Sequence, residues 1–175
     1  MKYILIIAFA FAGYEYVKTA ELRANSTPKT ISSTDYNFQV TLPGTPKNNV
    51  KMVNIAEYGK IKSTSYTVNH SDLTCTASIT HYVEQVRIPG DFYDQVDVAK
   101  RDLIDGFGGT INHEGIVYNG RQKGYEFNLR SRNNLLVRSQ IYKQQNNLLN
   151  LMCQYPNEDD SKLIVDNVMQ SLAFS

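Results

Sequence analysis

The feature that most constrains the fold is a two-residue alternation across residues 73–83. Leu73, Cys75, Ala77 and Ile79 occupy one set of alternate positions, and the positions between them are Thr or Ser. A strand with one apolar and one polar face is half-buried, which is typical of antiparallel sheets. Further strands are predicted at residues 38–42, 50–57, 60–68 and 148–155. The chain is therefore expected to form an antiparallel β-sheet.

The turn before this segment is constrained by which residues share a face. Residues that oppose each other on neighbouring strands must lie on one side of the sheet. A four-residue loop at residues 69–72 meets this condition. It places Val68 opposite Leu73 and Tyr66 opposite Cys75.

A second β-meander is predicted in the C-terminal half. Asn119-Gly120 is a two-residue hairpin signal, because both residue types tolerate positive φ. The next two strands carry apolar residues at odd positions, so the loop between them needs an odd length. Residues 132–134 provide it, with an Asn in the left-handed region. The residues expected to face the core are Tyr125, Phe127, Leu129, Leu135, Val137, Ile141, Leu149, Leu151, Cys153 and Tyr155.

Two segments have helical spacing instead. Residues 91–107 begin with Asp91, a suitable N-cap, and their helical spacing ends at Gly106, Gly108 and Gly109. Asn157 is expected to cap a second helix that has acidic residues in its first turn. The expected buried stripes are Phe92, Val96, Ala99, Leu103 and Phe107, then Ile164, Val168 and Leu172. The sequence thus predicts an α+β fold, an antiparallel β-sheet meander with two flanking helices, in one domain over residues 35–175.

The first residues have the pattern of an export signal. A positive start at Lys2 precedes an apolar run at residues 4–13, which is shorter than the roughly 20 residues that span a bilayer. We expect residues 1–20 to be a signal peptide, at a cleavage site left open, and residues 21–34 to be a polar linker. The protein would then be exported to the periplasm or the extracellular space, without spanning the membrane. The alternatives are an uncleaved anchor and a buried first strand.

Cys75 and Cys153 are the two cysteines of the chain. Both lie on faces that are expected to point inward. In an oxidising compartment such a pair favours a disulfide, provided that the two strands are neighbours or nearly so. The alternative is two buried free thiols.

Signals for catalysis and for cofactor binding are missing from the sequence. The chain has no G-x-S-x-G nucleophile elbow, and His70, His81 and His113 do not show metal-ligand spacing. The net charge of +1 gives no bulk attraction to nucleic acid. We therefore expect no enzyme, no cofactor, no metal and no nucleic-acid partner. An enzyme would need distant residues such as His81, His113 and Glu84 to converge.

A cluster of positive charge in the second meander is the candidate partner surface. Within residues 121–143 Glu126 is the one acid among six cations, which are Arg121, Lys123, Arg130, Arg132, Arg138 and Lys143. Strand parity places Arg130 and Arg138 on the outward face, and Arg132 lies in the loop between them. The same face is expected to carry Asn128, Gln140, Tyr142 and Asn150. Arg130, Arg132, Arg138 and Tyr142 are therefore predicted to contact an anionic protein partner. The alternative is a solvated face, paired with the acidic first helix.

Three runs of the sequence resemble the PsbP-like family. They are Phe38-x-Val40-x-Leu42-Pro43-Gly44-x-Pro46, the segment from Arg138-Ser139-Gln140-Ile141-Tyr142 through Leu149-Asn150-Leu151-Met152, and the ending Met169-Gln170-Ser171-Leu172-Ala173-Phe174. The resemblance covers residues 35–174 and implies an α/β/α sandwich.

The PsbP-like family includes an extrinsic photosystem II subunit, a Ran-binding import factor and bacterial envelope lipoproteins. Its members mostly bind other proteins or assist assembly. This chain lacks the lipidation cysteine of the envelope lipoproteins. The resemblance implies a non-catalytic exported protein of the cell envelope that binds an unknown protein partner or assists its assembly. The alternative is a small-ligand carrier with a cleft between sheet and helix, lined by Tyr125, Phe127 and Leu149.

Overall fold

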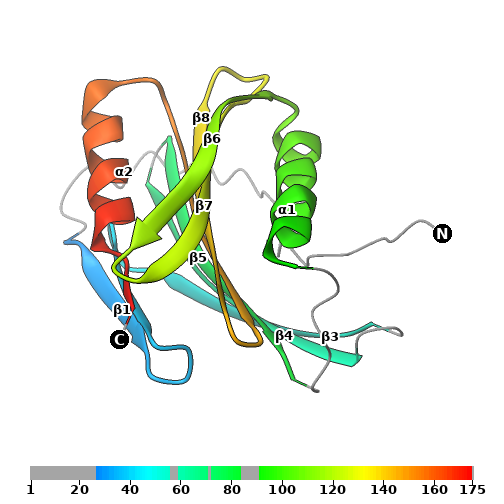
Figure 1. Ribbon diagram of the computed structural model, residues 1–175. Coiled ribbons are helices and arrows are strands. Elements are labelled where there is room, and N and C mark those ends of the chain that lie inside the picture. Colours follow the sequence, from blue (N-terminus) through cyan, green and yellow to red (C-terminus); the bar gives the residue numbers. More distant parts are fainter. Residues whose placement is uncertain (1–26, 56–58, 71, 84–90, 175) are drawn as a thin grey trace.

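The computed structural model describes residues 27–55, 59–70, 72–83 and 91–174 (Figure 1). The expected signal peptide lies outside the described residues. The elements in chain order are β1 (Lys29–Ser33), β2 (Phe38–Leu42), β3 (Lys47–Ile55), β4 (Gly59–His70), β5 (Leu73–Tyr82), α1 (Phe92–Phe107), β6 (Thr110–Asn119), β7 (Gln122–Arg130), β8 (Leu136–Gln144), β9 (Asn147–Tyr155), α2 (Asp159–Ser171) and β10 (Ala173–Phe174). The predicted α+β fold is confirmed.

The main sheet joins two meanders. Its strand order is β3-β4-β5-β9-β8-β7-β6, and every neighbouring pair is antiparallel. The first meander, β3 to β5, meets the second, β6 to β9, where β5 pairs with β9. The β5–β9 pair therefore joins two segments that are far apart in the sequence into one sheet.

A small second sheet has the order β1-β2-β10. Its outer strand β1 lies within the segment that was expected to be a polar linker. Lys29, Thr30 and Ser32 of β1 are exposed and Ser33 is half-buried, whereas Ile31 packs against the core. The hydroxyls of Thr30 and Thr41 also bond across the strand pair at 2.8 Å. One inward Ile among exposed polar residues is a weak sequence signal, and the linker prediction was wrong for these residues.

The two helices cover opposite faces of the main sheet, and the small sheet lies on the same face as α2 (Figure 1). Helix α2 and the small sheet pack on one face, where Val40, Leu151 and Val168 belong to one buried cluster. Helix α1 packs on the other, where Val96, Leu103 and Phe127 belong to a second. We call these the α2 face and the α1 face. This layering is the α/β/α sandwich that the resemblance implied.

The first helix begins as expected. The Asp91 carboxylate accepts from the backbone N–H groups of Tyr93 and Asp94, and the Asp94 carboxylate accepts from the N–H of Asp91. This capping box satisfies donors that a helix start otherwise leaves unpaired. Gly108 ends the helix at φ 60°, in the left-handed region that glycine favours.

The second helix differs from the prediction by one position. Its N-cap is Glu158 instead of Asn157, and no side chain caps it. The shift also changes the buried stripe, because Val165 is buried where Ile164 was expected, and Ile164 is exposed. The predicted burial of Val168 and Leu172 is confirmed.

Three turns form near their predicted positions with different lengths or registers. Val68 pairs with Cys75 and His70 with Leu73, so the β4–β5 turn is two residues shorter than expected. The next hairpin turns at residues 120–121, one position later than predicted. The β7–β8 loop spans residues 131–135, an odd length, and Asn134 has φ 61° as expected for a left-handed Asn.

The β8–β9 hairpin reverses one expectation about the core. Gln144 pairs with Asn147, so an even-numbered residue faces an odd-numbered one along the whole ladder. Ile141 therefore lies on the α1 face, and Leu149 lies on the α2 face. The sequence prediction placed both in a single core. The two-residue turn explains the correction, because it exchanges the faces of odd and even positions between the strands.

Candidate functional site

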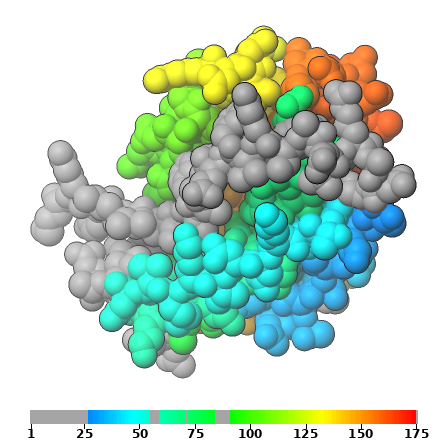
Figure 2. Space-filling view, turned by 180° about the vertical axis from the view of Figure 1, so that it is seen from behind, coloured from blue at the N-terminus to red at the C-terminus, as the bar shows by residue number. Residues whose placement is uncertain are grey.

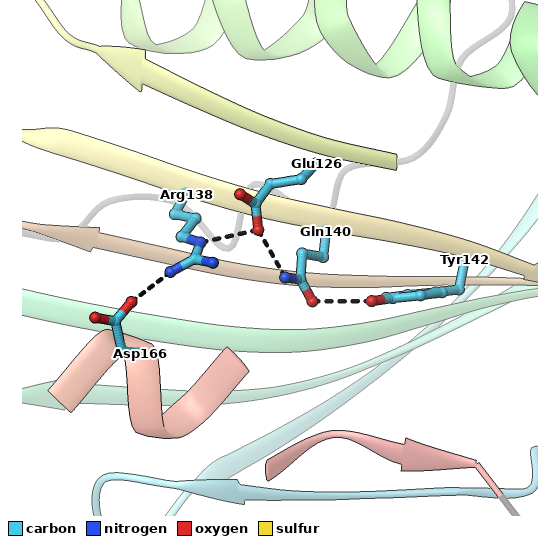
Figure 3. Close-up of polar contacts among 5 residues, drawn as sticks. All are labelled: Glu126, Arg138, Gln140, Tyr142 and Asp166. Carbon is cyan, nitrogen blue, oxygen red and sulfur yellow. Dashed lines mark hydrogen bonds and ion pairs between the residues drawn. The ribbon is translucent and has the colours of Figure 1, made fainter. Parts of the chain in front are cut away.

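A polar network crosses the α2 face between the sheet and helix α2 (Figure 3). Arg138 of β8 donates from Nε to Glu126 of β7 at 2.9 Å and from Nη1 to Asp166 of α2 at 2.5 Å. Gln140 donates to the same Glu126 oxygen at 2.7 Å and accepts from the Tyr142 hydroxyl at 3.0 Å. The network therefore ties two strands to a helix.

Tyr142 lies at the inner end of this network. It is 1% exposed, and its ring packs against Phe174 of β10 with the ring centroids 5.0 Å apart. On the other side it covers Gly124, where an added Cβ would lie 2.4 Å from the ring. Burial, helped by the Glu126 carboxylate, raises the pKa of Tyr142 to about 12. The hydroxyl is therefore a neutral hydrogen-bond donor.

This network changes the predicted partner surface. Tyr142 is buried, and Arg138 already pairs with two carboxylates, so neither side chain is free to meet a partner. The prediction failed for these two because the β8–β9 turn places even positions of β8 on the same face as the apolar residues of β9. Asn150, expected beside them, lies on the α1 face, where Ser139 donates to it at 2.8 Å.

Arg130 and Arg132, the other two predicted contacts, are exposed. The Arg132 side chain lies against Gly108 at the end of α1, where an added Cβ would be 2.6 Å from Arg132 Nε. Lys123 is on the α1 face, opposite the face of Arg138. The six cations therefore do not form one surface.

The sequence reasoning missed an exposed aromatic cluster on the α1 face. Tyr118 of β6, which is 70% exposed, faces Lys123 of β7. The Lys123 ammonium lies 4.8 Å from the ring centroid of Tyr93 and donates to the Tyr93 hydroxyl at 2.6 Å. Ile116, two residues before Tyr118, is also exposed. We call Tyr93, Ile116, Tyr118 and Lys123 the β6 patch.

The β6 patch adjoins an open sheet edge. Strand β6 ends the strand order, so β7 is its one partner strand among the described residues. Its first half has a register shift between Ile111 and His113 and an ion pair from Glu114 to Lys100 of α1 at 2.6 Å. Bulges and charges of this kind protect edges from pairing. The second half, residues 115–119, has no charged side chain. Alternation of Ile116 and Tyr118 was the available sequence signal.

The two described histidines of the other candidate site, His81 and His113, do not converge. His81 lies on β5 and bonds to Asn147 at 2.6 Å, whereas His113 lies on β6 at the far edge of the sheet. Glu84 is outside the described residues. Among the residues that the structure describes, no group of three His, Cys, Asp or Glu side chains is arranged to hold a metal.

The three residues predicted to line a carrier cleft lie on different faces of the main sheet. Tyr125 and Phe127 pack together on the α1 face, with ring centroids 5.1 Å apart. Leu149 lies on the α2 face. The main sheet separates them, so the three residues cannot line one cavity.

Cys75 and Cys153 form a disulfide across the junction of the two meanders. They are directly opposite each other on β5 and β9, and both are buried. Disulfides of this kind are typical of oxidising compartments. Within the described part of the chain, no helix is long and apolar enough to cross a membrane.

Comparison with solved structures identifies the architecture. The solution structure of cyanobacterial PsbP (CyanoP) from Synechocystis sp. PCC 6803 matches with a TM-score of 0.58, over 91% of this chain and 99% of that one, at 10% identity. The chain has the PsbP-like fold. A protein of unknown function from Pseudomonas aeruginosa (PA94) matches the PsbP-like domain less well, with a TM-score of 0.47, 82% and 94% coverage and 10% identity. No protein-family model matches the chain, and no curated protein sequence matches it.

Proposed function

We propose that this PsbP-like protein is a non-catalytic, exported module that binds another protein through the β6 patch. The observation that carries the proposal is the exposure of Ile116 and Tyr118 within the uncharged second half of the edge strand β6. Exposed aromatic and aliphatic side chains with a basic rim are typical of protein–protein contacts. An open strand edge also offers backbone groups to which an extended segment of the partner can add as a further strand.

Two observations support export. The first 20 residues have the pattern of a signal peptide. The buried Cys75–Cys153 disulfide fits a compartment in which thiols are oxidised.

The test is affinity capture from the native host with two matched double variants. Ile116→Ser with Tyr118→Ala removes the apolar part of the β6 patch. Arg130→Glu with Arg132→Glu alters the exposed remainder of the basic surface. We expect the first pair to lose the partner and the second pair to keep it. If the first double variant keeps the partner and the second loses it, the binding site includes Arg130 and Arg132 instead of the β6 patch.

A further inference from the structure

The first six residues of strand β3 are open on both faces. The strand ends the main sheet opposite β6, and β4 is its one partner strand among the residues described. A strand covered on one side alternates between buried and exposed residues, but residues 47–52 are all exposed. In Figure 2, which views the molecule from behind, the cyan atoms of this part of the chain lie at the surface. The strand is therefore accessible from either side of the sheet.

The described strands at this end of the sheet carry only positive formal charge. Strand β3 contributes Lys47 and Lys51, and β4 contributes Lys60 and Lys62. Strands β3, β4 and β5 contain neither Asp nor Glu. Within the described structure, none of the four lysines forms an ion pair. A net charge of +1 for the whole chain therefore conceals a local excess of positive charge.

The lysines occupy both faces of the β3–β4 ribbon. Lys60 pairs with Asn54 and Lys62 with Met52, so these two lysines share the α2 face with Val50 and Met52. Lys47 and Lys51 point to the opposite face. Val50 and Met52 are exposed, and Met52 is 58% exposed. The exposed side chains of Val50 and Met52 thus lie among lysines that project from both faces of the ribbon.

We infer that the β3–β4 ribbon docks on an anionic lipid surface. A rigid protein partner would contact one face of the ribbon and leave the lysines of the other face unpaired. Mobile lipid headgroups can surround both faces, so all four lysines gain from a negative surface potential. Val50 and Met52 then reach the boundary between headgroups and acyl chains, as the apolar side chains of interfacial segments do. This contact is separate from the β6 patch, which lies at the other edge of the sheet.

Vesicle flotation tests the charge requirement. The protein is used in the form that its native host produces, with vesicles of phosphatidylcholine alone or mixed in equal parts with phosphatidylglycerol. We expect binding to the mixed vesicles only, and weaker binding at higher salt. Lys47→Glu with Lys51→Glu should weaken it by about 100-fold. Lys29→Glu with Arg121→Glu makes the same change in net charge at exposed positions elsewhere and should leave binding within about threefold.

A fluorescent reporter tests the orientation. The chain has no Trp, so Met52→Trp introduces a single indole within β3, opposite Lys62 of β4. Its emission should shift to the blue with mixed vesicles. Leu163→Trp, at an exposed position on α2, should not shift.

Three results would overturn the inference. The protein could fail to bind mixed vesicles. The lysines would then serve to keep the β3 edge from pairing with other strands. The two charge reversals could weaken binding equally, which would indicate bulk charge. Binding could persist without a shift from the Trp at position 52, which would place the contact elsewhere. Since the capture experiment uses other variants, its outcome does not depend on these results.

Discussion

Arg138 shows at the scale of one residue why charge counting did not locate a surface. It is 24% exposed and pairs with Glu126, which is 9% exposed, and with Asp166, which is 50% exposed. Arg138→Met should lower the free energy of unfolding by about 2–3 kcal/mol, because it leaves the buried Glu126 carboxylate without its cation. Asp166→Asn should cost under about 1 kcal/mol, since that pair is half in water. Urea denaturation measures both, and equal losses would contradict this ranking.

Tyr142 provides a pH-dependent prediction. Its pKa is raised to about 12 in the folded protein, against 10.0 for the free side chain. Between these values the unfolded chain loses the phenolic proton and the folded chain keeps it, so stability falls as the pH rises from 10 to 12. The loss should approach about 2–3 kcal/mol. Tyr142→Phe should lack this component of the pH dependence when both proteins are denatured with urea at each pH. If the free energy of unfolding falls equally in the two proteins from pH 10 to 12, the assignment to Tyr142 is wrong.

Element by element, the strongest local signals predicted the structure best. Asp91 and the glycine after α1 mark that helix unambiguously in the sequence, and the structure has the cap and the stop. The β8–β9 turn has no such signal. It passes through Gln145 at φ 50°, without a glycine, and its length alone decides which side of the sheet Arg138 and Tyr142 face. The candidate surface was therefore misplaced by a turn, not by a misread strand.

The capping box of α1 gives the prediction at this scale. Asp91→Ala removes the acceptor for two backbone N–H groups and should lower the free energy of unfolding by about 1 kcal/mol. Asp97→Ala, at an exposed position on the same helix, is the control and should change stability by less than about 0.5 kcal/mol. If both substitutions cost the same in thermal denaturation, the capping box does not stabilise the helix.

In the whole molecule, the disulfide fastens the two meanders together. Cys75 and Cys153 are 78 residues apart in the sequence. Closing a loop of this length in the unfolded chain corresponds to about 4–5 kcal/mol in the chain-entropy model. The double variant Cys75→Ala, Cys153→Ala should be less stable than the oxidised protein by that amount in urea denaturation. A loss under about 1 kcal/mol would show that the strand pairing of β5 with β9 holds the meanders without help from the bond.

The central claim, that the β6 patch binds a protein partner, is tested most directly by site-specific photo-crosslinking in the native host. A photoreactive phenylalanine analogue is placed at Tyr118, and in a matched control at Leu163, which is also exposed but lies on α2. We predict one crosslinked partner from position 118 and none from position 163. A partner captured from position 163, with none from position 118, would contradict the claim.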